Sequence, residues 1–129
     1  MLTGYGGACQ ESSFVINGYN DGNNNNSISI TCGQVDCYQA EFTLTDIGNM
    51  QPINCNGLYL CESAIFNGAT NNILDINCNG KEACEKTDIY CPYQSENTCV
   101  INCGNYTDSC DNMRIFVSHY YALNYLDIK

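Results

Sequence analysis

The side chains in this chain with the clearest capacity for chemistry are its cysteines, which number eleven in 129 residues. Thiols gathered along a short chain either form disulfides or bind zinc. Zinc sites favour Cys-x2-Cys pairs with histidine in support, whereas the close cysteine pairs here are five to seven residues apart and His119 is the only histidine. The sequence therefore predicts a disulfide scaffold without a bound metal, in an oxidising location outside the cell or at its surface.

The sequence contains few other groups of residues that could support catalysis. His119 has no serine and aspartate partners that the sequence identifies, and no glycine-rich phosphate loop follows a strand. Four carboxylates fall near equivalent positions of successive repeats: Asp36, Glu62, Glu82 and Asp108. A catalytic pair among them is one interpretation, but acids that recur with a repeat more simply form a soluble polar face. The chain is therefore not expected to be an enzyme, and no catalytic residue or cofactor is assigned.

The charge balance narrows the classes of partner. The formal net charge is −10, with only four basic residues. Nucleic acid and anionic membrane surfaces both require clustered lysine and arginine, so neither is an expected partner. No apolar run approaches the roughly 18 residues of a membrane span. Residues 1–4 do not resemble a signal peptide, so we expect either a mature form or a segment of a longer chain.

The cysteines belong to a repeat of 23 to 27 residues. Ile-x-Cys triplets begin at Ile30, Ile53, Ile76 and Ile101, each is followed by a glycine turn, and Ile128 opens a further unit. A second cysteine then precedes a large apolar residue by five positions, in the pairs Cys9/Phe14, Cys37/Phe42, Cys61/Phe66, Cys84/Ile89 and Cys110/Ile115. Self-similarity at a fixed period is typical of a solenoid in which each unit packs against its neighbours.

Alternation of apolar and polar residues predicts two short strands in each unit. The pattern is clear at 28–32, 74–78 and 99–103, and again at 14–16 and 42–44. Asn, Gly, Ser and Asp fill the connections, as in turns. The predicted fold is an all-β parallel β-helix of about five coils, stapled by disulfides within the coils. The expected organisation is one domain, 1–129, with a half coil 1–27, coils 28–50, 51–73, 74–98 and 99–123, and a half coil 124–129.

The units also resemble a known class of repeat. Apolar-x-Cys, a glycine turn, a second cysteine and a downstream apolar strand are similar to the cysteine-rich β-solenoid repeats of extracellular proteins from eukaryotic microbes. The likeness covers Thr3 to Lys129. It implies a parallel β-helix and says little about activity.

The repetition of the cysteine pair suggests a disulfide assignment. If each coil closes its own turn, the bonds are Cys32–Cys37, Cys55–Cys61, Cys78–Cys84 and Cys103–Cys110, with Cys91–Cys99 as a fifth. Cys9 is left over, because Thr3 stands where its partner is expected. It is predicted to be either a buried thiol at the fringe of the core or the site of a bond to another chain or to further sequence.

Several polar motifs have weaker implications. Asn25 and Asn105 begin N-glycosylation motifs in predicted loops, although chance motifs are common among nineteen asparagines. The segment 21–26 superficially resembles a calcium loop but lacks spaced carboxylates, so it is interpreted as a polar loop.

Two further clusters are expected to support the stack of coils rather than to bind a ligand. Asn54, Asn77 and Asn102 occupy one position of successive coils and could form an amide ladder. The aromatic cluster 119–121, with Tyr125 behind it, is expected to pack over the end of the solenoid, with an exposed patch as the alternative.

The ends of the repeat bear on function. The chain is expected to begin with the second half of a coil and to finish with the first half of another, so that two copies together would complete one coil. This favours a structural subunit of an extracellular fibre that assembles head to tail with itself and carries N-linked glycan. Excision from a longer tandem array is the competing explanation. The alternative function is a solenoid module that binds carbohydrate or a surface.

Overall fold

The computed structural model of the chain describes residues 2–4, 9–17, 27–32, 37–45, 49–70, 73–93, 97–117 and 125–128. All secondary structure in these residues is β-strand, and no helix among them could span a membrane. The strands are β1 (Leu2–Gly4), β2 (Ser13–Asn17), β3 (Ser27–Ile28), β4 (Ile30–Cys32), β5 (Glu41–Thr45), β6 (Asn49–Met50), β7 (Ile53–Asn54), β8 (Ile65–Thr70), β9 (Ile73–Cys78), β10 (Asp88–Tyr90), β11 (Thr98–Cys103), β12 (Arg114–Phe116) and β13 (Tyr125–Ile128).

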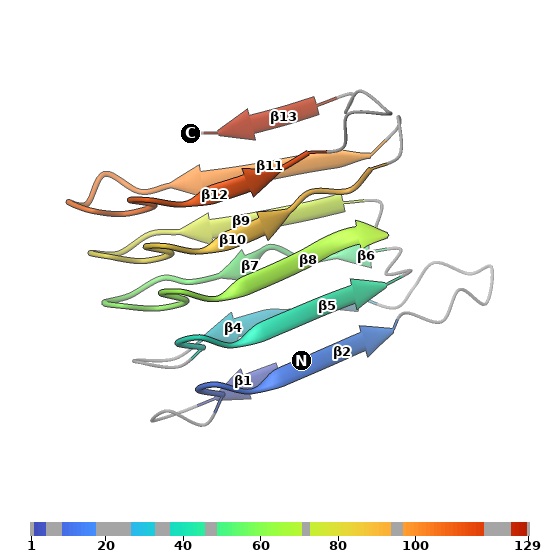
Figure 1. Cartoon of the computed structure of the whole chain (residues 1–129), viewed down its shortest axis with the longest axis horizontal. Coiled ribbons are helices and arrows are strands. Elements are labelled where there is room, and N and C mark those ends of the chain that lie inside the picture. Colours follow the sequence, from blue (N-terminus) through green and yellow to red (C-terminus); the bar gives the residue numbers. More distant parts are fainter. Residues whose placement is uncertain are drawn as a thin grey trace.

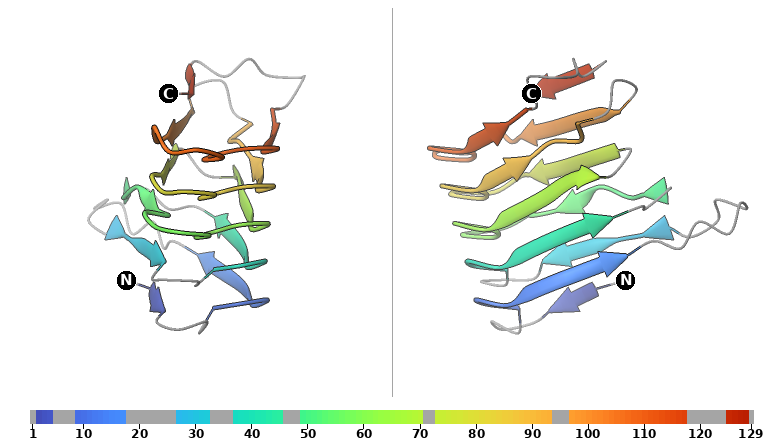
Figure 2. Two further views of the ribbon diagram at one scale, coloured as in Figure 1. Left: turned by 90° about the vertical axis from the view of Figure 1, so that its left-hand side faces the viewer. Right: turned by 45° about the vertical axis from the view of Figure 1, so that its right-hand side comes forward.

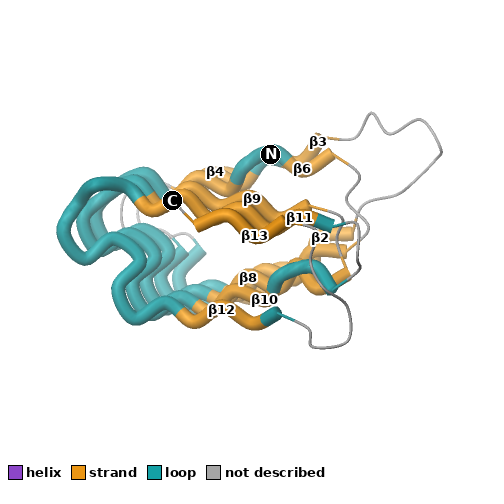
Figure 3. The backbone as a smooth tube through the Cα atoms, turned by 90° about the horizontal axis from the view of Figure 1, so that it is seen from above, coloured by secondary structure: helices purple, strands orange, loops and turns teal. Residues whose placement is uncertain are grey.

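Most of the described strands stack into two long parallel sheets that face each other (Figures 1 and 2), and β3 and β6 pair in a short third sheet. The six-stranded sheet has the order β1-β4-β7-β9-β11-β13, and the five-stranded sheet has the order β12-β10-β8-β5-β2. The chain alternates between the two sheets, so each pass around the core adds one strand to each of them. Figure 3 looks down the stack and shows the turns of successive coils superimposed. The prediction of an all-β parallel solenoid is confirmed.

The register of β1 corrects the predicted start of the repeat. Leu2 pairs with Ile30, and Gly4 pairs with Cys32. Residues 1–27 therefore contain a strand of each long sheet, β1 and β2, and the prediction of a half coil there is wrong. Gly4 also occupies the position of the first cysteine, where the sequence pointed to Thr3. The error arose because no cysteine marks this position, and a strand as short as β1 shows too little alternation to be recognised.

The core between the sheets is built from columns of identical or similar side chains. Phe14, Phe42 and Phe66 lie in register, and consecutive rings stack with centroids 5.3 Å apart. Inward residues such as Leu44 and Ile76 are fully buried. Burying an aliphatic or aromatic side chain of this size contributes about 1.5–3 kcal/mol, so these columns are the main force that holds coil on coil.

The turns that carry the second cysteines have an unusual backbone. In one of them, consecutive β-turns are closed by hydrogen bonds from Ala83 N to Gly80 O, Glu85 N to Glu82 O and Thr87 N to Cys84 O, at 3.2–3.3 Å. The third residue of each turn has a positive φ of 55–57° (Glu82, Cys84 and Lys86). None is glycine, so each costs roughly 1–2 kcal/mol in backbone strain.

Hydrogen bonds to neighbouring coils offset this strain. The N–H of Cys84 donates to Leu60 O in the preceding coil at 2.9 Å, whereas the N–H of Lys86 donates to Asp111 O in the following coil at 2.8 Å. Positive φ recurs at equivalent positions, Tyr59, Cys61 and Ser63 in one turn and Asp108, Cys110 and Asn112 in another. The stack therefore imposes the turn conformation, which the residue types alone did not predict.

Candidate functional site

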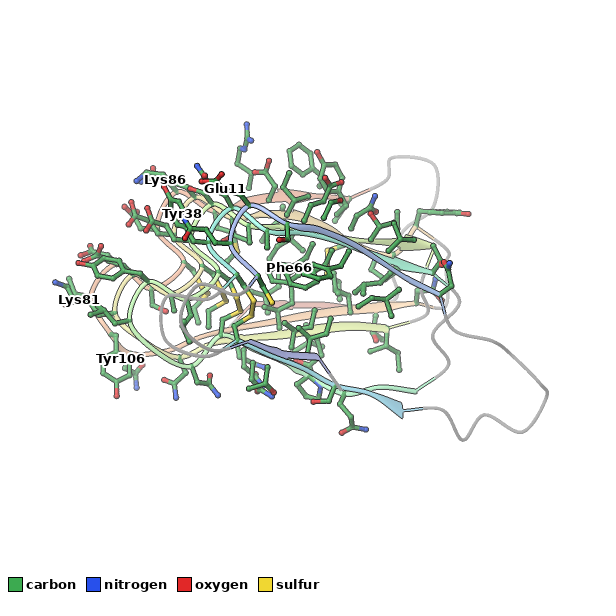
Figure 4. The ribbon with its side chains drawn as sticks, turned by 90° about the horizontal axis from the view of Figure 1, so that it is seen from below. Glu11, Tyr38, Phe66, Lys81, Lys86 and Tyr106 are labelled. Atoms are coloured by element: carbon green, nitrogen blue, oxygen red, sulfur yellow. A yellow bond between two sulfur atoms is a disulfide. The ribbon has the colours of Figure 1, made fainter. Side chains whose placement is uncertain are left out.

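The disulfides close the turns of the solenoid. Five bonds are present: Cys32–Cys37, Cys55–Cys61, Cys78–Cys84, Cys91–Cys99 and Cys103–Cys110. These are the pairs that the repeat suggested. Figure 4 shows them gathered beside the core, next to the turns that bear Lys81 and Lys86. Four of them fasten the end of a six-stranded-sheet strand to the turn that follows it, and the fifth closes the loop between β10 and β11.

Sulfur atoms of neighbouring coils come close together without forming a metal site. Sγ atoms of Cys32, Cys55 and Cys61 all lie within 4.8 Å of one another, and those of Cys32 and Cys61 are 3.5 Å apart. Each belongs to a disulfide and offers no thiolate ligand. Cys9 is only 5% exposed and lies outside the five disulfides, and a bond from it to another chain or to further sequence stays a prediction.

The described cations are paired with carboxylates on the turns and on the outer face of the five-stranded sheet. Lys81 Nζ lies 3.2 Å from Glu82, and Lys86 Nζ lies 2.5 Å from Glu85 and 3.9 Å from Glu62. Hydrogen bonds from these lysines to Glu82 and Glu85 raise the pKa of each lysine above its usual value. The charged form of each lysine is thus stabilised by its neighbouring carboxylate, as in an exposed surface salt bridge.

The four carboxylates near equivalent positions of successive repeats do not all share one position. Glu82 and Asp108 are equivalent, since each precedes its second cysteine by two residues and has a positive φ. Glu62 instead follows its cysteine and reaches toward Lys86, and Asp36 lies outside the described residues. Of the three carboxylates that the structure describes, Glu82 and Asp108 thus share a position of the repeat, and Glu62 does not. Glu62 is equivalent instead to Glu85, since each directly follows the second cysteine of its unit.

The asparagine ladder is present on the outer face of the six-stranded sheet. Asn77 Nδ2 donates to Asn54 Oδ1 at 3.1 Å, and Asn102 Nδ2 donates to Asn77 Oδ1 at 2.7 Å. Beside the ladder lies a shallow hollow of about 270 Å³, lined by Asn56, Asn77, Asn79, Asn102, Cys103 and Gly104. Amides that bond to one another across coils stabilise the stack, as the sequence suggested, and the hollow is the additional feature that the structure reveals.

The predicted surface motifs fall partly outside the described residues. Asn105 is exposed in the turn after β11, where the side chain is accessible to a glycosylating enzyme. Three of the predicted features lie outside the described residues: Asn25, the loop 21–26 and the aromatic cluster 119–121. The backbone of Tyr125 pairs with Thr98 in β11. Tyr106, next to Asn105, is 57% exposed.

An aromatic pair on the outer face was not singled out from the sequence. Tyr90 and Phe116 stack with centroids 4.5 Å apart, and the guanidinium of Arg114 lies 5.9 Å from the centre of the Phe116 ring. Arg114 also makes two hydrogen bonds of 2.6 Å to Asp88. Both aromatic residues directly follow an inward isoleucine, so their register was the signal that could have identified them.

The two ends of the five-stranded sheet are the regions that differ most from the rest. Phe14 and Ile16 at one end, and Met113 and Ile115 at the other, are only partly buried against the core. Phe42 and Phe66, in the same column as Phe14, are 0% exposed. Val15, on the outer face of β2, is 67% exposed. Within the part of the chain that the structure describes, these ends combine strand edges that pair with no further strand and incompletely covered apolar side chains, a combination suited to protein association.

Comparison with known proteins adds no assignment. No protein-family model, curated protein or solved structure matches this chain.

Proposed function

We propose that this protein is a structural element of an extracellular fibre, in which copies join end to end through the edges of their sheets. Five disulfides in a small solenoid are typical of extracellular proteins. The single observation that carries the proposal is the incomplete burial of the core at both ends of the five-stranded sheet. A second copy is the partner with complementary edges, because both ends continue the same parallel ladder.

The direction of the backbone hydrogen bonds supports end-to-end pairing. Within the sheets, Glu41 N donates to Ser12 O at 2.9 Å, and Arg114 N donates to Thr87 O at 2.9 Å. The N–H groups of residues on the outer face thus donate toward the N-terminal end of the stack. The N–H groups of inward residues donate toward the C-terminal end. By this alternation, the N–H of Val15 in β2 and that of Ile115 in β12 face the open edges. Each end offers the donors and acceptors that a parallel neighbour requires.

The experiment is assembly of the full oxidised chain, with a proline at one open edge. Thr3 pairs with Thr31 in register, and by the same alternation its N–H faces away from β4. Thr3→Pro removes that donor and leaves the bonds between β1 and β4. We expect wild type to form filaments in negative-stain images and Thr3→Pro to form single particles at the same concentration. Thr3→Ala, which keeps the N–H, is the matched control and should assemble like wild type.

Two results would contradict the proposal. One is a wild-type protein that remains monomeric at every concentration reached, as measured by sedimentation. The other is filament formation by Thr3→Pro equal to that of Thr3→Ala, which would place the contact away from the strand edges.

Glycosylation belongs to the same proposal. Asn105 is exposed on the turn that joins β11 to β12, the last described turn of the stack, so a glycan there must project sideways to leave end-to-end contact unobstructed. Expression in a eukaryotic secretory host followed by intact-mass measurement should show glycan mass that is lost in Asn105→Gln.

A second candidate function is carbohydrate binding, which the hollow beside the asparagine ladder favours. Carboxamides such as those of Asn56 and Asn79 can donate and accept hydrogen bonds, which matches sugar hydroxyl groups. A glycan array probed with the monomeric Thr3→Pro variant tests it. Binding that is lost in Asn79→Ala would favour this function over the fibre.

A further inference from the structure

The two long sheets contain unequal numbers of strands, and this limits how copies can stack. The six-stranded sheet runs from β1 to β13, whereas the five-stranded sheet runs from β2 to β12. To place β1 of a second copy on β13, that copy must move by six strand spacings, about 29 Å. To place its β2 on β12, it must move by five spacings, about 24 Å. A rigid copy cannot do both.

Each arrangement has a structural cost. With six spacings, one strand position stays empty in the five-stranded sheet, between β12 and β2 of the next copy. The half-buried residues Phe14 and Ile115 would then remain uncovered. With five spacings, β1 of the next copy needs the place on β11 that β13 occupies. Both sheets can become continuous from copy to copy only if β13 is displaced from the edge of β11.

Coverage of the core favours the shorter spacing. Phe14, Phe42, Phe66, Ile89 and Ile115 form one column in register across the five-stranded sheet. A copy shifted by five spacings places its Phe14 directly on Ile115 and so continues this column. The ladder between β13 and β11 spans four residue pairs and the one between β1 and β4 spans three. Exchange of β13 for β1 therefore changes the six-stranded sheet little, while the five-stranded sheet gains a new ladder and a covered core.

We propose that β13 is a displaceable cap that holds the place of β1 of the next copy, so that fibre growth proceeds by exchange of these two strands on the edge of β11. This rests on the proposed function and specifies its interface. In the single molecule, β13 covers the edge of β11 and slows association. In the fibre, β1 of the neighbour takes that edge, and β2 of the neighbour pairs with β12.

Two adjacent residues of β13 allow the cap to be tested in the full chain. Leu126 pairs with Cys99, and Asp127 pairs with Val100. In this sheet Gly104 N donates to Cys78 O, toward the N-terminal end, and the alternation makes the N–H of Asp127 donate to β11 while that of Leu126 faces the open edge. Asp127→Pro thus releases the cap, whereas Leu126→Pro blocks only pairing on top of it. Asp127→Ala and Leu126→Ala keep the N–H and serve as controls.

The readouts are the lowest protein concentration that supports filaments, followed by sedimentation, and the axial repeat in electron micrographs. We expect Asp127→Pro to lower that concentration about fivefold to tenfold, the effect of one ladder hydrogen bond. Leu126→Pro should leave it within about twofold of Leu126→Ala, within the ordinary scatter of edge substitutions. The repeat should be about 24 Å. Mass mapping of the five disulfides verifies that each variant is folded.

The outcomes separate this inference from the proposed function. Filaments with a repeat of about 29 Å that Leu126→Pro abolishes would show that β13 is the docking strand, which overturns the cap and leaves the fibre intact. An Asp127→Pro variant that assembles no better than Asp127→Ala would also overturn the cap. Absence of filaments from wild type and from all four variants would overturn the proposed function itself.

Discussion

The inner and outer coils of this solenoid have the same sequence pattern but differ in burial. Phe42 and Phe66 lie between neighbouring coils and are 0% exposed, whereas Phe14 and Ile115 occupy the same column at its ends and are only partly buried. The same is true of the disulfides, since Cys55–Cys61 is fully buried and both cysteines of Cys103–Cys110 are partly exposed. The position of a repeat in the stack, and not its residue types, decides how much each contact contributes.

This comparison explains why the ends are the functional candidates. Every inner coil receives hydrogen bonds and apolar contact from two sides, while an end coil receives them from one. An added copy would convert end coils into inner coils. Substitutions at equivalent positions of inner and outer coils therefore measure the difference directly, and proteins held as monomers by Thr3→Pro are the appropriate background for them.

The largest difference is expected in the aromatic column. Phe66→Ala removes a fully buried ring between two neighbours and should lower the free energy of unfolding by about 3–5 kcal/mol. Phe14→Ala, at the half-exposed end, should lower it by about 1–2 kcal/mol, because less area is lost and water can fill the gap. Denaturant unfolding with the disulfides intact provides the measurement. Equal losses would show that the end coil is as well packed as the centre.

Removal of whole disulfides should give the second-largest difference in stability between an inner and an outer coil. The chain-entropy model assigns about 2 kcal/mol to each of the short loops closed by Cys55–Cys61 and Cys103–Cys110. Replacing both central cysteines by alanine also leaves a void in a fully buried site, so that pair should cost about 1 kcal/mol more than the terminal pair. Thermal unfolding of the two double variants tests the order. A larger loss from the terminal pair would speak against the packing argument.

Glycine positions distinguish backbone contact from side-chain contact between coils. A Cβ on Gly80 would lie 2.2 Å from the carbonyl oxygen of Gly57, and one on Gly104 would lie 2.5 Å from Asn79 Oδ1. The backbone oxygen of Gly57 cannot move aside, whereas the exposed amide of Asn79 can rotate, which leaves Asn79 Cα at 3.0 Å as the remaining tight contact of the Gly104 Cβ. We expect Gly80→Ala to lower the free energy of unfolding by about 3 kcal/mol and Gly104→Ala by about 1 kcal/mol. Chemical denaturation that ranks them in reverse would contradict this account of coil spacing.

The smallest effect concerns the strained turns. Ser63 and Asn112 occupy the same position after their second cysteines, with φ of 56° and 53°. Ser63→Gly relieves a conformation that serine disfavours and should raise the free energy of unfolding by about 0.5 kcal/mol. Asn112→Gly should change it by about zero, because asparagine already tolerates this region. Ser63→Val, expected to lower stability by about 1–2 kcal/mol, verifies the sign; stabilisation by valine would exclude the strained conformation in solution.

The sequence predicted the inner part of the molecule well. The Ile-x-Cys triplets and the cysteine-to-apolar spacing led to parallel strands in register, to the asparagine ladder and to a pairing of Cys32 with Cys37 and its equivalents. Each of these features depends on contact between equivalent residues of neighbouring coils, so repetition in the sequence is direct information about contact in space.

Prediction failed where repetition gave no information. β1 has Gly4 in place of the first cysteine, so its strand was missed and the first coil was taken for half a coil. Positive φ at residues such as Lys86 could not be predicted, because propensity favours glycine there and the stack overrides it. The partial burial of Phe14 and Ile115 depends on which coils have neighbours, a property of the assembled fold rather than of any local pattern.

Amide hydrogen exchange at the two open edges tests the central claim most directly. The N–H groups of Val15 and Ile115 should exchange rapidly in the monomer and become protected in the assembled protein, while the N–H of Thr43, whose residue pairs with Val15 inside the sheet, should stay protected in both. Wild type below and above the concentration at which filaments form gives the comparison. Protection that appears at both edges together with elongation supports end-to-end pairing of the sheets. Elongated particles in which Val15 and Ile115 still exchange as in the monomer would contradict continuation of the five-stranded sheet from one copy to the next.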